Sequence, residues 1–421
     1  MESADRESSM TTWKLVALLT FLIAEMTATP LVAASMAKCW GKLDRPNMSC
    51  IPHDVINVHE VGAAGDGRTD DTAALQSAFD EARRAGRAVF LPLGDYVYTN
   101  QLKIEGIQVF GVGPQTRLMP QVPTLQRVLV TGESPVLACL QIMYHDLERS
   151  GSDHGRKGVM VQNAHNFLVR NVIFNGQGLS RMPKYGGGAL FIYRSSHGKI
   201  LNNHLLYTAA DAIHITGGSQ NIVVEGNRIE FAGDDGIAVV NYGKAVRNSI
   251  VIKNNMVMNN RWGRNISAVG GQDVQILGNS IMGNAADGAG IYIASEPAYD
   301  TAGSENILVQ GNTLLNTGGP GKGHGQIMLW NGNDKLIKDV QIRNNNIQAS
   351  KRGDLAIVIS NAVRNVVLEG NNADGTATLY GGATIRETSE RSVAAGGSFG
   401  FPVPPAGDMF DQCSAAIERQ P

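Results

Sequence analysis

The sequence predicts an all-β protein, a right-handed parallel β-helix solenoid with an N-terminal capping helix. Short runs of alternating apolar and polar residues recur, and each ends in an asparagine. These asparagines are Asn203, Asn227, Asn255, Asn279, Asn312, Asn345 and Asn371. Their intervals of 24, 28, 24, 33, 33 and 26 residues are typical of a solenoid rather than a globular domain. The 421-residue chain also holds 49 glycines and only 6% aromatic residues, which suits coils that need many turns.

The recurring asparagine is expected to be structural. At a fixed turn, an asparagine tolerates the left-handed backbone conformation and can hydrogen-bond its copy on the next coil. The asparagines therefore predict a ladder that runs through the stacked coils, rather than a set of catalytic groups.

Residues 1–37 are predicted to be a signal peptide. Lys14 precedes an apolar stretch over residues 15–24, and small residues follow up to Ala37. The stretch is too short to span a bilayer, so we expect a secreted or periplasmic protein with no stable membrane span after processing. The alternative is an uncleaved membrane anchor.

Export would permit disulfide bonds. The four cysteines, at positions 39, 50, 139 and 413, allow three pairings. Cys39 and Cys50 are closest in sequence and are the favoured pair, which would leave Cys139 for Cys413. No Cys/His spacing indicates zinc, so no metal site is expected.

Residues 38–101 are expected to form a lead-in and a capping helix over 71–85. Thr69 or Asp70 can cap the N-terminus of this helix, and Gly86 ends it. Its apolar stripe consists of Ala74, Leu75, Ala78, Phe79 and Ala82. Because the open end of a solenoid exposes strand edges that pair with other chains, this amphipathic helix is the natural cover.

This N-terminal segment also resembles a known family. GAAGDGRTDDTAALQSAF, followed by GRAVFLPLGDY, resembles the N-terminal region of the pectate-lyase superfamily of right-handed parallel β-helices. The resemblance implies the fold and a polysaccharide substrate, but no particular reaction. Coils are then expected over residues 102–392, with a C-terminal tail over 393–421.

The strands that follow the asparagine turns bring acidic residues together. Aligning them places Asp211, Asp235 and Arg264 in one column on three successive coils, which lie about 4.8 Å apart in a sheet. Asp234 adds a third carboxylate. Mutual repulsion raises the pKa of at least one carboxyl, which provides an acid and a base at the same pH. The alternatives are a surface ladder paired with Arg264 and an adventitious cation site.

A second column is predicted to face outward beside the first. Its members are His214, Ala238, Ser267, Tyr292 and Met328. His214 and Tyr292, together with Arg264, are the candidate substrate-binding residues. Strict strand alternation places Asp234 and Asp235 on opposite faces, so both reach one cleft only if the preceding turn continues through them.

The acidic coils carry a second resemblance. NHLLYTAADAIHI, followed by NRIEFAGDDGIAVV, resembles the Asn-Thr-Asp and Gly-Asp-Asp coils of the polygalacturonase family of glycoside hydrolases, which includes rhamnogalacturonase/epimerase-like members. The resemblance implies that Asp234 is the general acid. It also implies that Asp211 and Asp235 activate water and that the anomeric centre inverts.

Other motifs of that family are missing. Its Gly-His-Gly should lie one coil later, where WGRNISAV places Arg264 near the histidine position, and its Arg-Ile-Lys should follow where GIYIASE stands. A Gly-His-Gly at 323–325 comes two coils too late, so His324 is expected to be a loop residue. Since the lost Arg and Lys bind the uronate carboxylate in that family, a different sugar is expected here.

Three functions stay open. The first is a secreted glycoside hydrolase that acts on a polysaccharide without a cofactor. The second is a polysaccharide lyase or uronate epimerase, which needs a base and a cation such as Arg264 or Ca²⁺ to neutralise a carboxylate. The third is a non-catalytic β-helix that binds glycans. The net charge of −2 gives no basic field for nucleic acid.

Overall fold

The computed structural model describes residues 54–121, 127–144, 158–176, 188–332, 335–348, 355–360, 362–373, 376–379 and 385–388. The predicted signal peptide and C-terminal tail lie outside these residues, as do three of the four cysteines. Cys139 is disulfide-bonded. Among the described residues, no helix is both long and apolar enough to cross a membrane.

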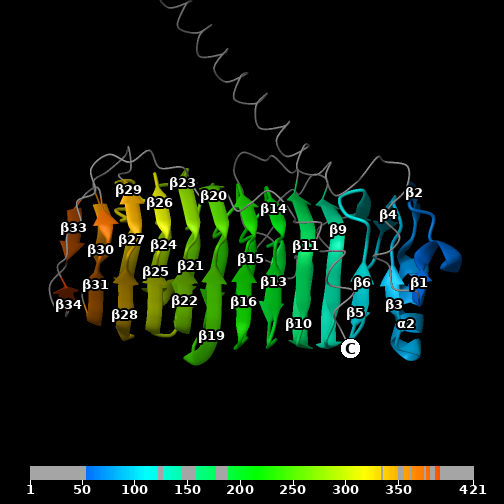
Figure 1. Ribbon diagram of the computed structural model, residues 1–421, viewed down its shortest axis with the longest axis horizontal. Coiled ribbons are helices and arrows are strands. Elements are labelled where there is room, and N and C mark those ends of the chain that lie inside the picture. The colour runs from blue at the N-terminus through cyan, green and yellow to red at the C-terminus, as the bar shows by residue number, and fades with distance from the viewer. Residues whose placement is uncertain are drawn as a thin grey trace, which may run out of the picture. The chain divides into compact units, whose positions relative to one another are not determined.

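The chain winds into a parallel β-helix, as the sequence predicts. Among the described residues, all strand pairings are parallel, in two long sheets of 11 and 23 strands. Figure 1 shows their strands stacked along the long axis of the solenoid. The 11-stranded sheet consists of β5 (Leu102–Glu105), β8 (Val128–Glu133), β10 (Val159–His165), β12 (Leu190–Tyr193), β15 (Ile213–Thr216), β18 (Ile237–Val240), β21 (Ile266–Val269), β24 (Ile291–Ser295), β27 (Ile327–Asn331), β30 (Leu355–Ile359) and β33 (Thr376–Leu379). We call it the site sheet.

The 23-stranded sheet contains two ladders, which meet in the long strands β9 and β11. The first ladder consists of β1 (Val55–Asn57), β3 (Ala88–Phe90), β6 (Gln108–Phe110), β9 (Val136–Tyr144), β11 (Leu168–Gly176), β13 (Lys199–Leu201), β16 (Ile222–Glu225), β19 (Val246–Lys253), β22 (Gly271–Leu277), β25 (Glu305–Gln310), β28 (Ile337–Arg343), β31 (Val363–Glu369) and β34 (Ile385–Thr388). The second adds β2 (Asp66–Asp70), β4 (Gly94–Tyr98), β7 (Thr116–Pro120), β14 (His204–Leu206), β17 (Arg228–Glu230), β20 (Met256–Asn260), β23 (Ser280–Asn284), β26 (Thr313–Leu315), β29 (Asn346–Gln348) and β32 (Asn372–Ala373).

The core lies inside the coils. Inward residues of the site sheet, such as Ile213, Ile237 and Ile266, are fully buried and stack directly on one another. Burying each such side chain contributes roughly 1.5–3 kcal/mol. The alternation of these residues with outward ones confirms the strand period read from the sequence.

The predicted ladder of asparagine side chains is present. It lies at the turns between the two sets of strands that make up the large sheet. Asn255 Oδ1 accepts hydrogen bonds from the backbone N–H and the side-chain Nδ2 of Asn227, both at 2.9 Å. Its own Nδ2 donates to Asn279 Oδ1 and to the carbonyl of Val224, both at 3.0 Å. The same pattern runs from Asn203 to Asn371. The ladder therefore fixes the vertical register of successive coils.

One detail of the predicted turn is wrong. The left-handed conformation belongs to the residue before each ladder asparagine, as at Asn254 (φ 55°) and Gly278 (φ 59°). Glycine and asparagine tolerate that conformation, so the repeated signal is a pair, Gly-Asn or Asn-Asn. The second member makes the ladder hydrogen bonds.

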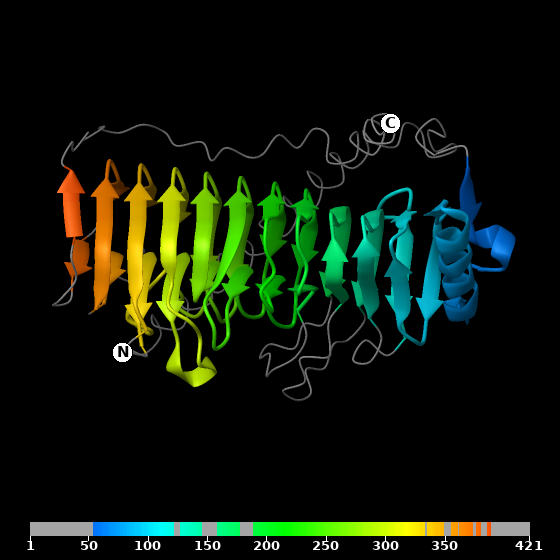
Figure 2. The ribbon, with the colours of Figure 1, turned by 90° about the horizontal axis from the view of Figure 1, so that it is seen from below.

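The capping helix α2 (Thr72–Ala85) covers the N-terminal end of the coils, as Figure 2 shows. Its predicted stripe packs on the core, with Leu75, Ala78 and Ala82 fully buried. The helix begins one residue later than expected, because its N-cap is Asp71. The buried Asp71 carboxylate accepts hydrogen bonds from two upstream backbone N–H groups instead of capping the helix.

The parallel ladders begin before residue 102. Strand β1 pairs with β3 and β3 pairs with β6, so the expected lead-in already forms coils, and α2 is an insertion in them. Two short 3₁₀ helices, η2 (Val58–Val61) and η3 (Pro297–Tyr299), lie in turns.

We predict that Asn255→Ala lowers the free energy of unfolding by about 3 kcal/mol, because it leaves buried N–H and C=O groups without partners. Urea denaturation followed by circular dichroism measures this change. Asn372→Ala, at an exposed asparagine near the end of the solenoid, is the matched control and should change stability by less than about 0.5 kcal/mol. Equal stability of the two variants would contradict a structural role for the ladder.

Candidate active site

The predicted column of site residues is present. Ile213 pairs with Ile237, and Ile237 pairs with Ile266, so the residues two positions earlier, Asp211, Asp235 and Arg264, occupy one register. All three lie in turns that precede strands of the site sheet. Strand β18 starts only at Ile237, so the turn before it continues through both Asp234 and Asp235. This is the condition under which both carboxylates can face the same side.

The three carboxylates converge. Oxygen atoms of Asp211, Asp234 and Asp235 all lie within 4.8 Å of one another. Asp211 is fixed at both oxygens, since Oδ1 accepts the backbone N–H of Asp235 at 2.8 Å and Oδ2 lies 2.5 Å from Nδ1 of His214. An ionised carboxylate only accepts, so Nδ1 of His214 carries the hydrogen of this bond.

Asp235 is the most deeply placed of the three carboxylates, at 6% exposure. Its Oδ1 accepts the backbone N–H of Arg264 at 2.6 Å, and its Oδ2 accepts the hydroxyl of Ser267 at 2.5 Å. Burial raises the pKa of Asp235, and the charge of Asp211 raises it further, although the Arg264 guanidinium opposes both effects. Half-buried Asp211 and Asp234 are more open to a ligand.

A glycine makes room for this cluster. A Cβ atom at Gly263 would lie 2.3 Å from an Oδ1 atom of both Asp234 and Asp235. That separation is far below van der Waals contact, so any side chain at this position would displace the carboxylates. The arrangement of the carboxylates therefore requires a glycine at position 263.

Arg264 has its charge balanced within the protein. Its guanidinium pairs with Glu296 and lies 3.7 Å from Asp235 Oδ1, and it stacks 4.0 Å from the ring centre of Tyr292. Burial acts to lower the pKa of Arg264, but the charges of Asp235 and Glu296 outweigh burial and raise it. The Arg264 side chain is only 17% exposed, so it contacts the carboxylate cluster from the protein side rather than from solvent.

Tyr292 lies beneath the surface, at 2% exposure. Its hydroxyl donates to Glu296 at 3.1 Å, and its ring packs against Arg264 on one side. The ring of His324 stacks on it at 5.6 Å between centroids. Of the predicted substrate-binding residues, Tyr292 and Arg264 therefore form a buried support, whereas His214 lies nearest to the carboxylates.

The sequence did not reveal that the loop over residues 318–325 returns to the cluster. Lys322 Nζ donates to the carbonyl of Trp262 and lies 4.8 Å from its ring centre. Nδ1 of His324 accepts the backbone N–H of Ala289 at 3.2 Å. The available signal was the asparagine interval, which lengthens from 24 to 33 residues on the coils that carry the long loops.

Exposed aromatic side chains lie on the same part of the solenoid. Among the described residues, the large aromatic side chains that stay exposed are Tyr242 (48%), Trp262 (57%) and Tyr299 (61%). Trp262 directly precedes Gly263, and the Tyr242 turn pairs with Thr301, beside Tyr299. Flat aromatic faces of this kind can stack on sugar rings.

The carboxylate cluster offers oxygen ligands that are already engaged within the protein. Calcium takes six to eight oxygen ligands, whereas both oxygens of Asp211 and of Asp235 already accept hydrogen bonds from the protein. The Arg264 guanidinium beside Asp235 would also repel a metal ion. A Ca²⁺ ion here would have to share the carboxylate oxygens with these hydrogen bonds.

A parallel β-helix that carries clustered carboxylates beside exposed aromatic rings defines a polysaccharide-active β-helix protein. The model of the rhamnogalacturonase A/epimerase, pectate lyase-like family matches residues 55–292, more than half of the chain. The chain belongs to this family, as the two resemblances predicted.

Individual proteins match less completely. Alginate lyase 7 of Azotobacter vinelandii is 56% identical over 41 residues, which make up 10% of this chain and 5% of that protein. The chain thus matches only a small part of the length of its curated relatives.

Two solved structures share the fold over most of the chain. The catalytic unit of the GH87 α-1,3-glucanase from Streptomyces thermodiastaticus strain HF3-3 has a TM-score of 0.60 at 20% identity, covering 81% of this chain and 71% of that one. PfbA, a surface adhesin of Streptococcus pneumoniae, has a TM-score of 0.54 at 17% identity, covering 75% of this chain and 91% of that one. At such identities the likeness establishes the β-helix alone.

We predict that His324 stays neutral down to about pH 4. Burial lowers its pKa from 6.5 to about 4, and the charges of Arg264 and Lys322 add to the effect. Because the unfolded chain takes up this proton first, the folded protein loses stability as the pH falls from 6.5 towards 4, by at most roughly 3 kcal/mol.

The ring-proton resonances of His324, assigned by their absence in His324→Gln, report this pKa directly by NMR. His324→Gln should also show less loss of stability than the wild type between pH 7 and pH 4.5. A resonance that titrates near pH 6.5 would contradict the buried placement of His324.

Proposed function

We propose that the protein is a secreted glycoside hydrolase that cleaves a polysaccharide at the Asp211–Asp234–Asp235 cluster. The observation that carries this proposal is the convergence of three carboxylates with unequal environments on the outer side of one sheet. Glycoside hydrolysis needs one protonated carboxyl for the leaving oxygen and one ionised carboxylate for water. The reaction needs water and no cofactor.

The proposed roles combine the contacts of the carboxylates with the resemblance of the acidic coils to those of polygalacturonases. Asp211, which accepts hydrogen bonds from His214 and from the Asp235 N–H, is a base. Asp235 and Asp211 together activate the attacking water. A negative charge on one of these two carboxylates disfavours a second negative charge on the other. Asp234, half-buried and next to both, has the position of the general acid in the resemblance and donates the proton to the leaving oxygen.

Charge at the site favours a neutral sugar at the cleaved bond. Asp211, Asp234, Asp235 and Glu296 outnumber the nearby cations Arg264 and Lys322, and Arg264 is already paired with two carboxylates. A uronate placed here would meet like charge without a free guanidinium to neutralise it. This supports the expectation of a sugar other than galacturonate.

Secretion is part of the proposal. It rests on the N-terminal pattern, in which a lysine is followed by an apolar run and small residues. Cys139 in β9 is disulfide-bonded, which fits an oxidising compartment.

A lyase or uronate epimerase is the second candidate, and a contact favours it. Arg264 lies over the Tyr292 ring next to His324, so a cation, a phenol and an imidazole are close together. The short match to alginate lyase 7 points the same way. Against it stand the burial of Tyr292 and the internal pairing of Arg264.

We predict that Asp234→Asn lowers the rate of glycan hydrolysis by about 10²–10⁴-fold, because an amide cannot act as a general acid. New reducing ends measured on a panel of polysaccharides follow the reaction, and melting temperature confirms the fold. Asp273→Asn, on the large sheet, is the matched control and should keep the wild-type rate. Unchanged activity of Asp234→Asn on every active glycan would rule out the proposed mechanism.

Tyr292→Phe separates hydrolysis from elimination. If Tyr292 only supports Arg264, loss of its hydroxyl lowers activity by at most about tenfold, since one hydrogen bond to Glu296 is lost. A lyase that used Tyr292 as its base would lose nearly all activity. The products of the wild-type protein should lack the ultraviolet absorbance of unsaturated uronates. A chelator should leave the rate unchanged. The opposite results would establish a lyase.

A further inference from the structure

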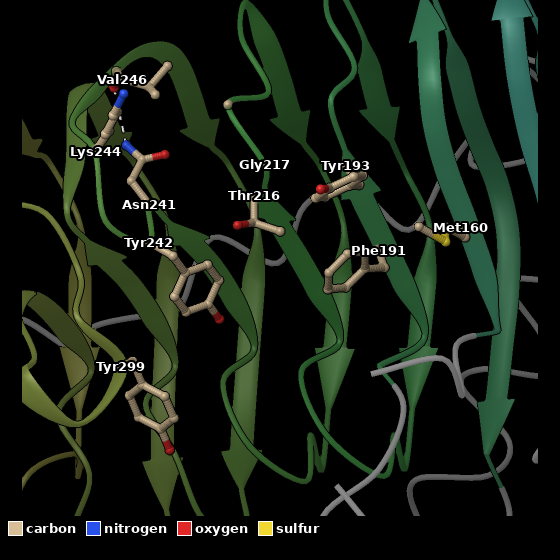
Figure 3. Close-up of a pocket in the computed structure, with 11 residues that line it drawn as sticks. Met160, Phe191, Tyr193, Thr216, Gly217, Asn241, Tyr242, Lys244, Val246 and Tyr299 are labelled. Atoms are coloured by element: carbon tan, nitrogen blue, oxygen red, sulfur yellow. Dashed lines mark hydrogen bonds between the residues drawn. The ribbon is translucent and has the colours of Figure 1, made fainter. Parts of the chain in front are cut away.

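A pocket opens on the site sheet on the N-terminal side of the carboxylates. It has a volume of about 580 Å³, within the range of small-molecule sites. Its floor is the outward face of β10, β12 and β15, with Met160, Phe191 and Tyr193 in view in Figure 3. Tyr242 and Tyr299 form one wall.

The floor is built around an aromatic ring. Phe191 and Tyr193 lie on the same face of β12, with ring centroids 6.5 Å apart and planes 27° from parallel. A Cβ atom at Gly217 would lie 2.4 Å from the ring of Tyr193, so the ring needs a glycine beneath it. Gly217 also has a positive φ of 65°, which any other residue would adopt with strain.

Two polar atoms at this face lack partners among the described residues. The Thr216 side chain lines the pocket at 3% exposure, and its hydroxyl makes no hydrogen bond. Nε2 of His214, on the same strand, is also buried and unpaired. Native proteins pair nearly all such groups, so the Thr216 hydroxyl at the pocket has unused hydrogen-bonding capacity.

Two stacked rings connect the floor of the pocket to the carboxylate cluster. The ring of Phe191, in the floor, stacks on the ring of His214 at 4.8 Å with planes 3° apart. His214 in turn contacts Asp211 at 2.5 Å. His214 therefore lies between the floor of the pocket and Asp211, and a glycan chain that extends from the pocket past His214 would reach the carboxylates.

Few charged groups lie at the pocket, although the Arg194 guanidinium lies 4.9 Å from the centre of the Tyr193 ring. No carboxylate lines it, and exposed Lys244 at the rim is its one cation among the described lining residues. The nearby carboxylates give the surroundings a negative potential, which disfavours an anionic ligand. Aromatic faces and an unpaired hydroxyl instead suit a ring with an apolar C–H face and hydroxyl groups at its edge.

We propose that this pocket binds an uncharged pyranose residue of the glycan, next to the bond that is cleaved at the carboxylates. The sugar ring packs against Tyr193 and Tyr242, and one of its hydroxyl groups pairs with Thr216. The inference rests on the proposed function and extends it to the class of sugar that the site selects.

Equilibrium binding tests the proposal in the full chain with Asp234→Asn, so that the ligand is not consumed. The probes are neutral tetrasaccharides of glucose and galactose in several linkages and, as the anionic counterpart of equal length, tetragalacturonate. Titration calorimetry gives each Kd. We expect a neutral tetrasaccharide to bind at least tenfold more tightly than tetragalacturonate.

Thr216→Val keeps the shape of the side chain and removes only the hydroxyl. It should weaken binding of the neutral tetrasaccharide about tenfold while leaving the melting temperature unchanged or higher, because an unpaired buried hydroxyl is lost. Tyr193→Ala should weaken binding at least as much. Thr313→Val, on the large sheet, is the matched control and should bind as the parent does.

Three outcomes would overturn the proposal. They are tighter binding of tetragalacturonate than of the neutral probes, no binding of any neutral probe, and unchanged binding in both pocket variants. These results are distinct from a failure of the hydrolase mechanism. Wild-type hydrolysis with unchanged binding in Thr216→Val and Tyr193→Ala would refute only the pocket. Full activity of Asp234→Asn would refute only the assigned acid.

Discussion

The hydrogen-bonded asparagine ladder is the constraint on which the rest of the structure depends. Each ladder side chain joins two coils and leaves no freedom for a vertical slip, because its donors and acceptors are buried and all are used. With the register fixed at that turn, the strand that follows begins at a fixed position on every coil. Side chains 24 to 29 residues apart in sequence, such as Asp211, Asp235 and Arg264, then meet in space.

The site combines fixed geometry with unequal environments. Asp211 accepts hydrogen bonds at both oxygens, whereas burial raises the pKa of Asp235. The Arg264 guanidinium pairs with Asp235 and Glu296 inside the protein. Its positive charge reduces the repulsion between the carboxylates, and it is not available to bind a ligand. Carboxyl groups on adjacent coils thus have unequal surroundings, which their hydrogen-bond partners and their burial set.

The sequence allowed the fold and the column of site residues to be predicted, because both follow from periodicity. A strand period of two and one asparagine per coil suffice to align Asp211 with Asp235 and Arg264. The placement of Lys322 and His324 was not predictable in this way, since a loop has no period and its path depends on contacts such as those with Trp262 and Ala289. The left-handed residue was misassigned by one position, because asparagine is common at both positions of the turn.

The returning loop over residues 318–325 shows how such a scaffold can diversify. It leaves the coil after one strand of the large sheet and rejoins before β27, so neither its length nor its composition enters the ladder. Insertions there alter the chemistry above the cleft while the scaffold keeps its spacing. The contacts that this loop makes above the carboxylates and the spacing of the coils thus depend on separate stretches of the chain.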